Sequence, residues 1–124
     1  MATTSMAVLL VAHGSRRREA NDDLVQLADM LRTRLPDRFV EAAYLELAEP
    51  SIPAGLARCR EQGAREIHML PWFLSAGSHV TDDLTRFRDE FTAQYPDVRV
   101  TLHPPLGLHP LMVDILLARL AESL

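Results

Sequence analysis

His13, His79 and Glu46 are the residues whose types best suit metal chemistry in this sequence. Neutral imidazole binds borderline divalent metals such as iron, cobalt, nickel and zinc, and it also accepts protons near neutral pH. Two histidines and one carboxylate would leave open positions on a bound metal, as a reactive site requires. The three residues come from separate segments, so no spacing rule certifies them. The alternative is that the histidines are hydrogen-bonded polar residues and that Glu46 is a solvated carboxylate.

A cluster of three arginines stands out in a chain of formal net charge −4, and it consists of Arg16, Arg17 and Arg18. Cations at the start of a helix oppose the helix dipole, so the cluster favours an anionic ligand, with a solvated helix start as the alternative. Arginine binds carboxylates and phosphates in bidentate geometry. Ser15 lacks the G-x-S-x-G surroundings of a hydrolase nucleophile. We therefore interpret Gly14 and Ser15 as a tight turn that caps the next helix.

Alternation of apolar runs and periodic segments predicts the elements that position these residues. The expected strands are residues 6–12, 39–45, 66–70 and 98–102. The expected helices have apolar faces formed by Ala20, Leu24, Leu27, Leu31 and Leu35; by Ile52, Leu56 and Cys59; by Val80, Leu84, Phe87 and Phe91; and, from near Pro110, by Leu111, Ile115, Leu116 and Leu120. The order βαβαβαβα predicts an α/β fold, flavodoxin-like, with an open, four-stranded, mainly parallel sheet and helices on both faces. A length of 124 residues suits a single domain over residues 1–124.

Helix boundaries have their own signals. Pro36 is expected to end the first helix and Gly63 to form the C-cap of the second. Ser78 is a candidate N-cap for the third helix, with Asp82 and Asp83 in its first turn, where acidic side chains favour the helix dipole.

Ligands of an open parallel sheet bind at the carboxyl ends of its strands. The segments at those ends are residues 13–18, 46–53, 71–79 and 103–110, and they contain four of the five histidines. This placement favours convergence of the three candidate metal residues at one edge. The fifth histidine, His68, is expected inside a strand with a hydrogen-bonded ring. His109 is interpreted as a residue that caps a helix or anchors a loop.

Composition excludes several function classes. All 13 basic residues are arginines, which excludes lysine-dependent use of ATP or pyridoxal phosphate. A single cysteine, Cys59, allows neither an internal disulfide nor a cysteine-based zinc site. The acidic balance argues against nucleic acid as a partner. The one N-terminal apolar run is too short for a membrane span and has its arginines on the wrong side for a signal peptide. We therefore expect a soluble, cytoplasmic protein with no membrane partner.

Four strings in the sequence together resemble those of the small sirohydrochlorin chelatases, the short CbiX-type cobaltochelatases. They are LLVAHGSRRREAND, YLELAEPSIP, MLPWFLSAGSHVTDDL and PPLGLHP, and the resemblance runs over residues 8–119. Each string is weak alone, but the set in this order is specific. The family implies a chelatase-like α/β fold and ATP-independent insertion of a divalent metal into a tetrapyrrole, in cobalamin or siroheme biosynthesis. The absence of a phosphate-loop lysine agrees with that class.

The resemblance also implies roles for individual residues. His13 and His79 match the family histidines that hold the metal and accept pyrrole protons, and Glu46 matches the carboxylate that assists them. Sirohydrochlorin is a polycarboxylate, which gives the arginine cluster a task. The residues expected to contact this substrate are Ser15, Arg16, Arg17, Arg18, Leu47, Trp72, Phe73, Leu74, Ser75, Gly77 and Ser78. A role for Trp72 and Phe73 in the core or in a dimer interface is an equal alternative.

The expected assembly is a homodimer, because the chain is similar to one half of the longer two-domain chelatases. No permanent cofactor is expected. The metal is a substrate, with Co²⁺ favoured over Fe²⁺ and Ni²⁺, and the Irving–Williams order makes affinity a poor guide to the choice. Two other functions stay open. One is a non-catalytic carrier of metal or tetrapyrrole that uses the same pocket. The other is a phosphate-binding module that uses the helix start after Ser15.

Overall fold

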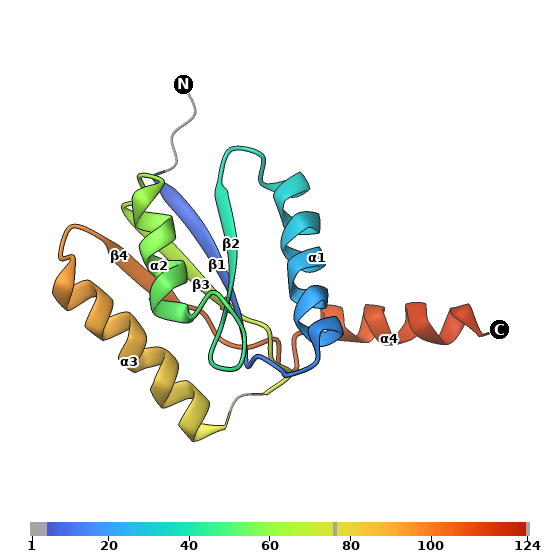
Figure 1. Ribbon diagram of the computed structural model, residues 1–124. Coiled ribbons are helices and arrows are strands. Elements are labelled where there is room, and N and C mark those ends of the chain that lie inside the picture. The colour runs from blue at the N-terminus through green and yellow to red at the C-terminus, as the bar shows by residue number, and fades with distance from the viewer. Residues whose placement is uncertain (1–4, 76, 124) are drawn as a thin grey trace.

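The computed structural model describes residues 5–75 and 77–123. Its strands are β1 (Met6–Ala12), β2 (Phe39–Tyr44), β3 (Glu66–Pro71) and β4 (Arg99–Leu102), and its helices are α1 (Arg18–Arg34), α2 (Ile52–Glu61), α3 (Ser78–Gln94) and α4 (Leu111–Glu122). The strands form one parallel sheet in the order β2-β1-β3-β4. Figure 1 shows the strands side by side with helices on either side. The predicted α/β architecture and element order are confirmed.

The central strand β1 is buried on both faces, as its unbroken apolar sequence predicts. Successive side chains of a strand point to opposite faces, so Leu9 and Val11 enter one core cluster while Val8 and Leu10 enter another. No polar or charged side chain among the described residues is fully buried. The charged side chains and the histidines therefore lie at or near the surface.

Three helices cover the sheet. Helix α1 packs on one face through Leu24 and Ala28. Helices α2 and α3 share the other face, where Leu56 of α2 and Leu84 and Phe91 of α3 belong to the same core cluster. These helices carry the apolar periodicity that the sequence predicted. No described helix is long and apolar enough to cross a membrane.

The start of α3 corrects one prediction. Gly77, not Ser78, is the N-cap, and no side chain caps this helix. Ser78 is the first helical residue, so its hydroxyl does not occupy the position from which a cap reaches the next amides. Asp82 and Asp83 accordingly lie beyond the first turn. Ser51, for which no role was predicted, does cap α2, because its side chain accepts a hydrogen bond from the Ala54 amide at 3.3 Å.

Helix α4 was predicted as an element, but it does not help to cover the sheet. None of its residues is buried, and Figure 1 shows it extending away from the rest of the molecule. The loop before it is tied to the loop after β3, because the Leu106 amide donates to the Phe73 carbonyl at 2.9 Å and the Gly107 amide to the Leu74 carbonyl at 2.8 Å. The loop is therefore attached to the carboxyl edge of the sheet, whereas the helix that follows it packs on no part of the sheet.

Candidate functional site at the carboxyl edge of the sheet

His13 and Glu46 lie side by side where β1 and β2 end. The parallel pairing of the two strands continues past their ends, with the Leu45 amide donating to the Ala12 carbonyl at 2.9 Å and the Glu46 amide to the His13 carbonyl at 3.0 Å. These backbone bonds fix the separation of the two chains. They bring together two residues that are 33 positions apart in the sequence.

The two side chains of this pair are also bonded to each other. His13 Nε2 lies 2.9 Å from Glu46 Oε2, and the two side chains are 52% and 56% exposed. A carboxylate oxygen only accepts, so Nε2 carries the hydrogen, and in the neutral ring Nδ1 keeps a lone pair. A carboxylate that fixes the tautomer of a histidine in this way is a common arrangement behind metal-binding imidazoles. A polar contact so exposed contributes at most about 1 kcal/mol, so stability does not explain it.

Gly14 makes the close approach of these two segments possible. Its φ is +97°, and a Cβ atom built there would lie 1.8 Å from the Glu46 carbonyl oxygen. Only glycine combines this left-handed backbone with room for the neighbouring strand end. The sequence indicated a turn at this residue, and the structure shows that the turn also makes room for Glu46.

Asn21 and Tyr44 hold the loop after β1 in place, and neither residue was predicted from the sequence. The Asn21 side chain accepts from the Ser15 amide at 2.9 Å and donates to the Ser15 carbonyl at 2.7 Å. The Tyr44 hydroxyl donates to the Asn21 carbonyl at 2.8 Å. Burial, and to a lesser extent the charges of Asp22 and Glu41, raise the pKa of Tyr44, which keeps the hydroxyl protonated as a donor. A polar residue in the first turn of a helix was the only signal available.

The arginine cluster lies at the start of α1 with its side chains exposed. Arg17 is the N-cap and Arg18 the first residue of the helix. Ser15 Oγ accepts from the Arg17 amide at 3.0 Å, just ahead of the helix, so it anchors the entry of the chain into α1. Within residues 5–75 and 77–123, no ion pair joins Arg16, Arg17 or Arg18 to a carboxylate. The cluster is free to bind an anion.

His79 is exposed as the second residue of α3. Among the described residues, no hydrogen bond or ion pair joins it to His13 or Glu46. The part of the chain that the structure describes also contains no group of three or more His, Cys, Asp and Glu residues placed to hold a metal. The structure thus brings His13 and Glu46 together and leaves His79 apart from them, on α3.

Apolar side chains surround the same edge. Trp72 and Leu74 are 45% and 66% exposed, whereas Phe73 packs partly against the core. A groove of about 430 Å³ is lined by Trp72, Phe73, Leu74, Leu106, Met112 and Ile115. Leu47, next to Glu46, is exposed and has a φ of +66°, a conformation that non-glycine residues rarely adopt and that recurs at functional sites. Ser75 and Gly77 are exposed ahead of α3, and Ser78 is exposed as its first residue.

Comparison with known proteins decides the family. The profile of the CbiX family matches residues 7–123. The chain belongs to the CbiX family. A sirohydrochlorin ferrochelatase of Priestia megaterium is 36% identical over 117 residues, which are 94% of this chain and 44% of the relative. A sirohydrochlorin cobaltochelatase of Sulfurisphaera tokodaii is 30% identical over 94% of this chain and 92% of its own length.

A solved structure supports the same assignment. The sirohydrochlorin chelatase SirB of Bacillus subtilis subspecies spizizenii, crystallised in complex with cobalt, superposes with a TM-score of 0.86 at 27% identity. The match covers 95% of this CbiX-family chain and 50% of that protein. The chain therefore spans about half the length of the first curated relatives that it matches, but nearly the full length of the Sulfurisphaera protein.

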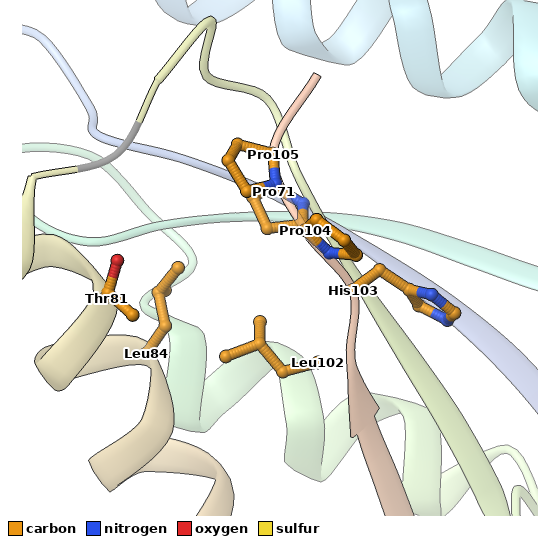
Figure 2. Close-up of a pocket in the computed structure, with 7 residues that line it drawn as sticks. All are labelled: Pro71, Thr81, Leu84, Leu102, His103, Pro104 and Pro105. Carbon is orange, nitrogen blue, oxygen red and sulfur yellow. The ribbon is translucent and has the colours of Figure 1, made fainter. Parts of the chain in front are cut away.

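A separate cavity of about 280 Å³ lies between α3 and β4 of this CbiX-family chain. Figure 2 shows Thr81, Leu84 and Leu102 around it, while the ring of His103 lies on the other side of β4. None of the predicted site residues lines this cavity. Its lining is mostly apolar, so we assign no chemistry to it.

The His103 ring belongs instead to a hydrogen-bonded chain on the sheet face that α1 shares. His68 Nδ1 lies 2.8 Å from His103 Nε2, and His68 Nε2 lies 2.7 Å from Glu66 Oε2. The prediction of a hydrogen-bonded His68 in a strand is confirmed. His109 also has the predicted anchoring role, because its Nδ1 accepts from the Leu111 amide at the start of α4 at 3.1 Å.

The hydrogen bond between His68 and Glu66 predicts that the free energy of unfolding depends on pH. The hydrogen bond from His68, and then the charge of Arg99, lower the pKa of Glu66, outweighing a smaller opposing effect of burial. A lowered carboxyl pKa means that the stabilisation is present above the ordinary pKa and is lost as the pH falls through the lowered value. Glu66→Gln is therefore expected to be less stable than wild type at neutral pH, with a difference that shrinks in acid.

Urea denaturation of both proteins at a series of pH values measures this effect. The exposed Glu61 provides a control, since Glu61→Gln should show no such pH-dependent difference. A Glu66→Gln difference that stays constant through the acid range would show that the carboxylate contributes nothing through its charge.

Proposed function

We propose that this CbiX-family chain inserts a divalent metal, with Co²⁺ favoured over Fe²⁺ and Ni²⁺, into sirohydrochlorin without using ATP. The observation that best supports this function is the exposed pair of His13 and Glu46, whose Nε2 and Oε2 atoms lie 2.9 Å apart where two parallel strands end. The relatives, which include both sirohydrochlorin cobaltochelatases and ferrochelatases, support the reaction class. Cobalt is favoured because the cobaltochelatase of Sulfurisphaera tokodaii matches over nearly its whole length.

The chemistry divides between three residues. In metallation, four ring nitrogens replace the water ligands of the metal ion, and two pyrrole N–H protons are released. His13 and His79 hold the incoming metal through ring nitrogens that have lone pairs, and these open contacts allow the metal to be passed on. Glu46 is an acceptor for a released proton, and it also fixes the tautomer of His13. Released protons then pass to water, so the enzyme returns to its starting state.

The substrate would be held by two kinds of contact. Arg16, Arg17 and Arg18 are exposed and unpaired among the described residues, which suits the peripheral carboxylates of sirohydrochlorin. Leu47, Trp72 and Leu74 offer apolar surface at the same edge for the flat macrocycle, and the exposed part of Phe73 extends it. Ser15, Ser75 and Gly77 belong to the loops that border this surface, and Ser78 begins the helix that follows.

A second copy of the chain would complete the enclosure. The first curated relatives are about twice as long as the segment that this chain matches. We propose that two copies pair with their carboxyl edges close together, as a homodimer.

An anaerobic insertion assay tests the function. Purified protein is mixed with sirohydrochlorin in excess and with Co²⁺, Fe²⁺ or Ni²⁺, and metallation is followed by absorbance against a protein-free reaction. We expect repeated turnover, fastest with Co²⁺. Conversion that stops at one equivalent per site would identify a carrier instead. Binding of phosphate ligands with no effect of metal or tetrapyrrole would identify a phosphate-binding module.

A further inference from the structure

Helix α4 presents an apolar surface that its own chain leaves exposed. Val113, Leu116, Leu117 and Leu120 recur at steps of three and four, so they form one stripe, and each is at least half exposed. Leu111 and Ile115 extend the apolar surface around the helix. Exposed apolar patches of this extent mark interaction sites in soluble proteins.

A complementary groove lies on the face of the sheet that α1 covers only in part. Leu27 and Leu31 of α1 form one wall, and Leu70, Pro71, Trp72, Pro104 and Leu106 form the rest, with Leu10 at the base. Its volume is about 260 Å³. Helix α1 packs on β1 and β2, whereas α2 and α3 are on the opposite face, so no described helix covers β3 and β4 on this side.

The polar side chains near this groove already have hydrogen-bond partners. On the same face, the rings of His68 and His103 are bonded to each other, and His68 is also bonded to Glu66. Covering hydrogen-bonded polar groups costs much less than covering unpaired ones. An apolar helix can therefore lie across this half of the sheet.

We infer that α4 of each copy lies in the groove between α1 and β3 of a second copy, so that two chains exchange their last helices. This inference rests on the pairing proposed above and names the surfaces that make it. A second copy is the occupant because one chain carries both surfaces, and because α4 extends away from its own groove (Figure 1). A symmetric pair makes this contact twice, and the two contacts together should bury the ~1,200 Å² or more that is typical of specific interfaces.

The exchange also explains where the second copy lies. Helix α4 begins directly after the loop at the carboxyl edge, next to Trp72 and Leu106, which line both the groove for α4 and the larger groove beside it. A partner held by α4 is therefore held at the edge that carries His13 and Glu46.

Thiol cross-linking of the full chain tests the exchange. Leu31→Cys places a thiol on the wall of the groove, and Leu116→Cys places one on the α4 stripe. The native Cys59 should not react with the cross-linker, because the residue is buried and burial raises the pKa of its thiol to about 12. With a short bis-maleimide, the double variant is expected to form a covalent dimer, whereas each single variant stays monomeric on a denaturing gel. The products are identified by mass spectrometry of the linked peptides.

Other products would overturn the inference. A link between residues 31 and 116 within one chain would mean that α4 folds back on its own groove. A dimer formed by Leu116→Cys alone would mean that two α4 helices pack on each other. Absence of any product from the double variant, at a concentration where sedimentation shows dimers, would place the interface elsewhere.

Sedimentation supplies an independent measurement. The chain of 13.9 kDa is expected to sediment as a dimer at micromolar concentration, and Leu116→Asp as a folded monomer. Met30→Asp is the matched control, since Met30 is as exposed as Leu116, at 65% against 68%, but is not among the residues that line this groove. A wild-type monomer, or an undiminished Leu116→Asp dimer, contradicts the exchange. Neither readout depends on turnover, so a dimer without chelatase activity would reject the proposed function alone.

Discussion

The His13→Ala variant is expected to lose metal insertion by about 100-fold or more while keeping its fold, and His79→Ala should behave in the same way. Both side chains are exposed and neither belongs to a core cluster, so their removal leaves no cavity. The loss follows because a metal held by one imidazole is bound too weakly to be positioned over the macrocycle. Turnover is measured in the anaerobic assay and folding by circular dichroism.

His109 provides the control for this pair of variants. It is an exposed histidine at the same edge, and its ring only accepts a hydrogen bond from the start of α4. His109→Ala should stay within a few-fold of wild-type turnover. If His13→Ala or His79→Ala also keeps near-normal turnover, the proposed mechanism is wrong. Unfolding of either variant would instead assign that histidine a structural role.

Glu46→Gln separates the two roles of the carboxylate. The amide oxygen can still accept from His13 Nε2, so the ring keeps its tautomer and metal affinity should change little. An amide cannot take up a pyrrole proton, so turnover should fall much more than metal affinity does. Equal losses in both quantities would mean that Glu46 acts as a metal ligand.

Much of the scaffold could be predicted because its signals are local. The unbroken apolar run of β1 indicated a strand buried on both faces, and the alternation of strands and helices indicated a parallel sheet. The rule that strand carboxyl ends share one edge then placed His13 near Glu46. The backbone bonds that continue the β1–β2 ladder beyond Ala12 are the physical reason for that success.

The failures concern contacts that depend on three-dimensional partners. Helical periodicity predicted α4 but could not say which surface its apolar face meets, and its own chain buries none of it. The bond between His68 and His103 requires the β3–β4 register, in which His68 pairs with Thr101 and Met69 with Leu102. Sequence spacing alone gives no register. His79 likewise comes from a segment that no spacing rule relates to His13, so the distance between the two histidines could not be predicted.

Gly14→Ala adds one methyl group, and we expect it to lower the stability more than a glycine-to-alanine change at any other glycine of this edge. An alanine at a φ of +97° costs about 1–2 kcal/mol for its left-handed backbone. Its Cβ would also lie 1.8 Å from the Glu46 carbonyl oxygen, which is backbone and cannot rotate away. Together these terms should lower the free energy of unfolding by about 3 kcal/mol or more. Relief by movement of the loop would break the bond between the Glu46 amide and the His13 carbonyl, and turnover would fall with it.

Gly77→Ala is the matched control for this substitution. Gly77 has a φ of −68°, and no atom outside its chain neighbours lies within 4 Å of an added Cβ. Its stability should stay within about 1 kcal/mol of wild type, the range of an exposed N-cap change. Urea denaturation of both variants gives the comparison. Gly14 affects the His13 and Glu46 pair only through the backbone. A Gly14→Ala protein that is destabilised yet keeps full turnover would therefore show that the close approach of the two strand ends serves the fold and not the reaction.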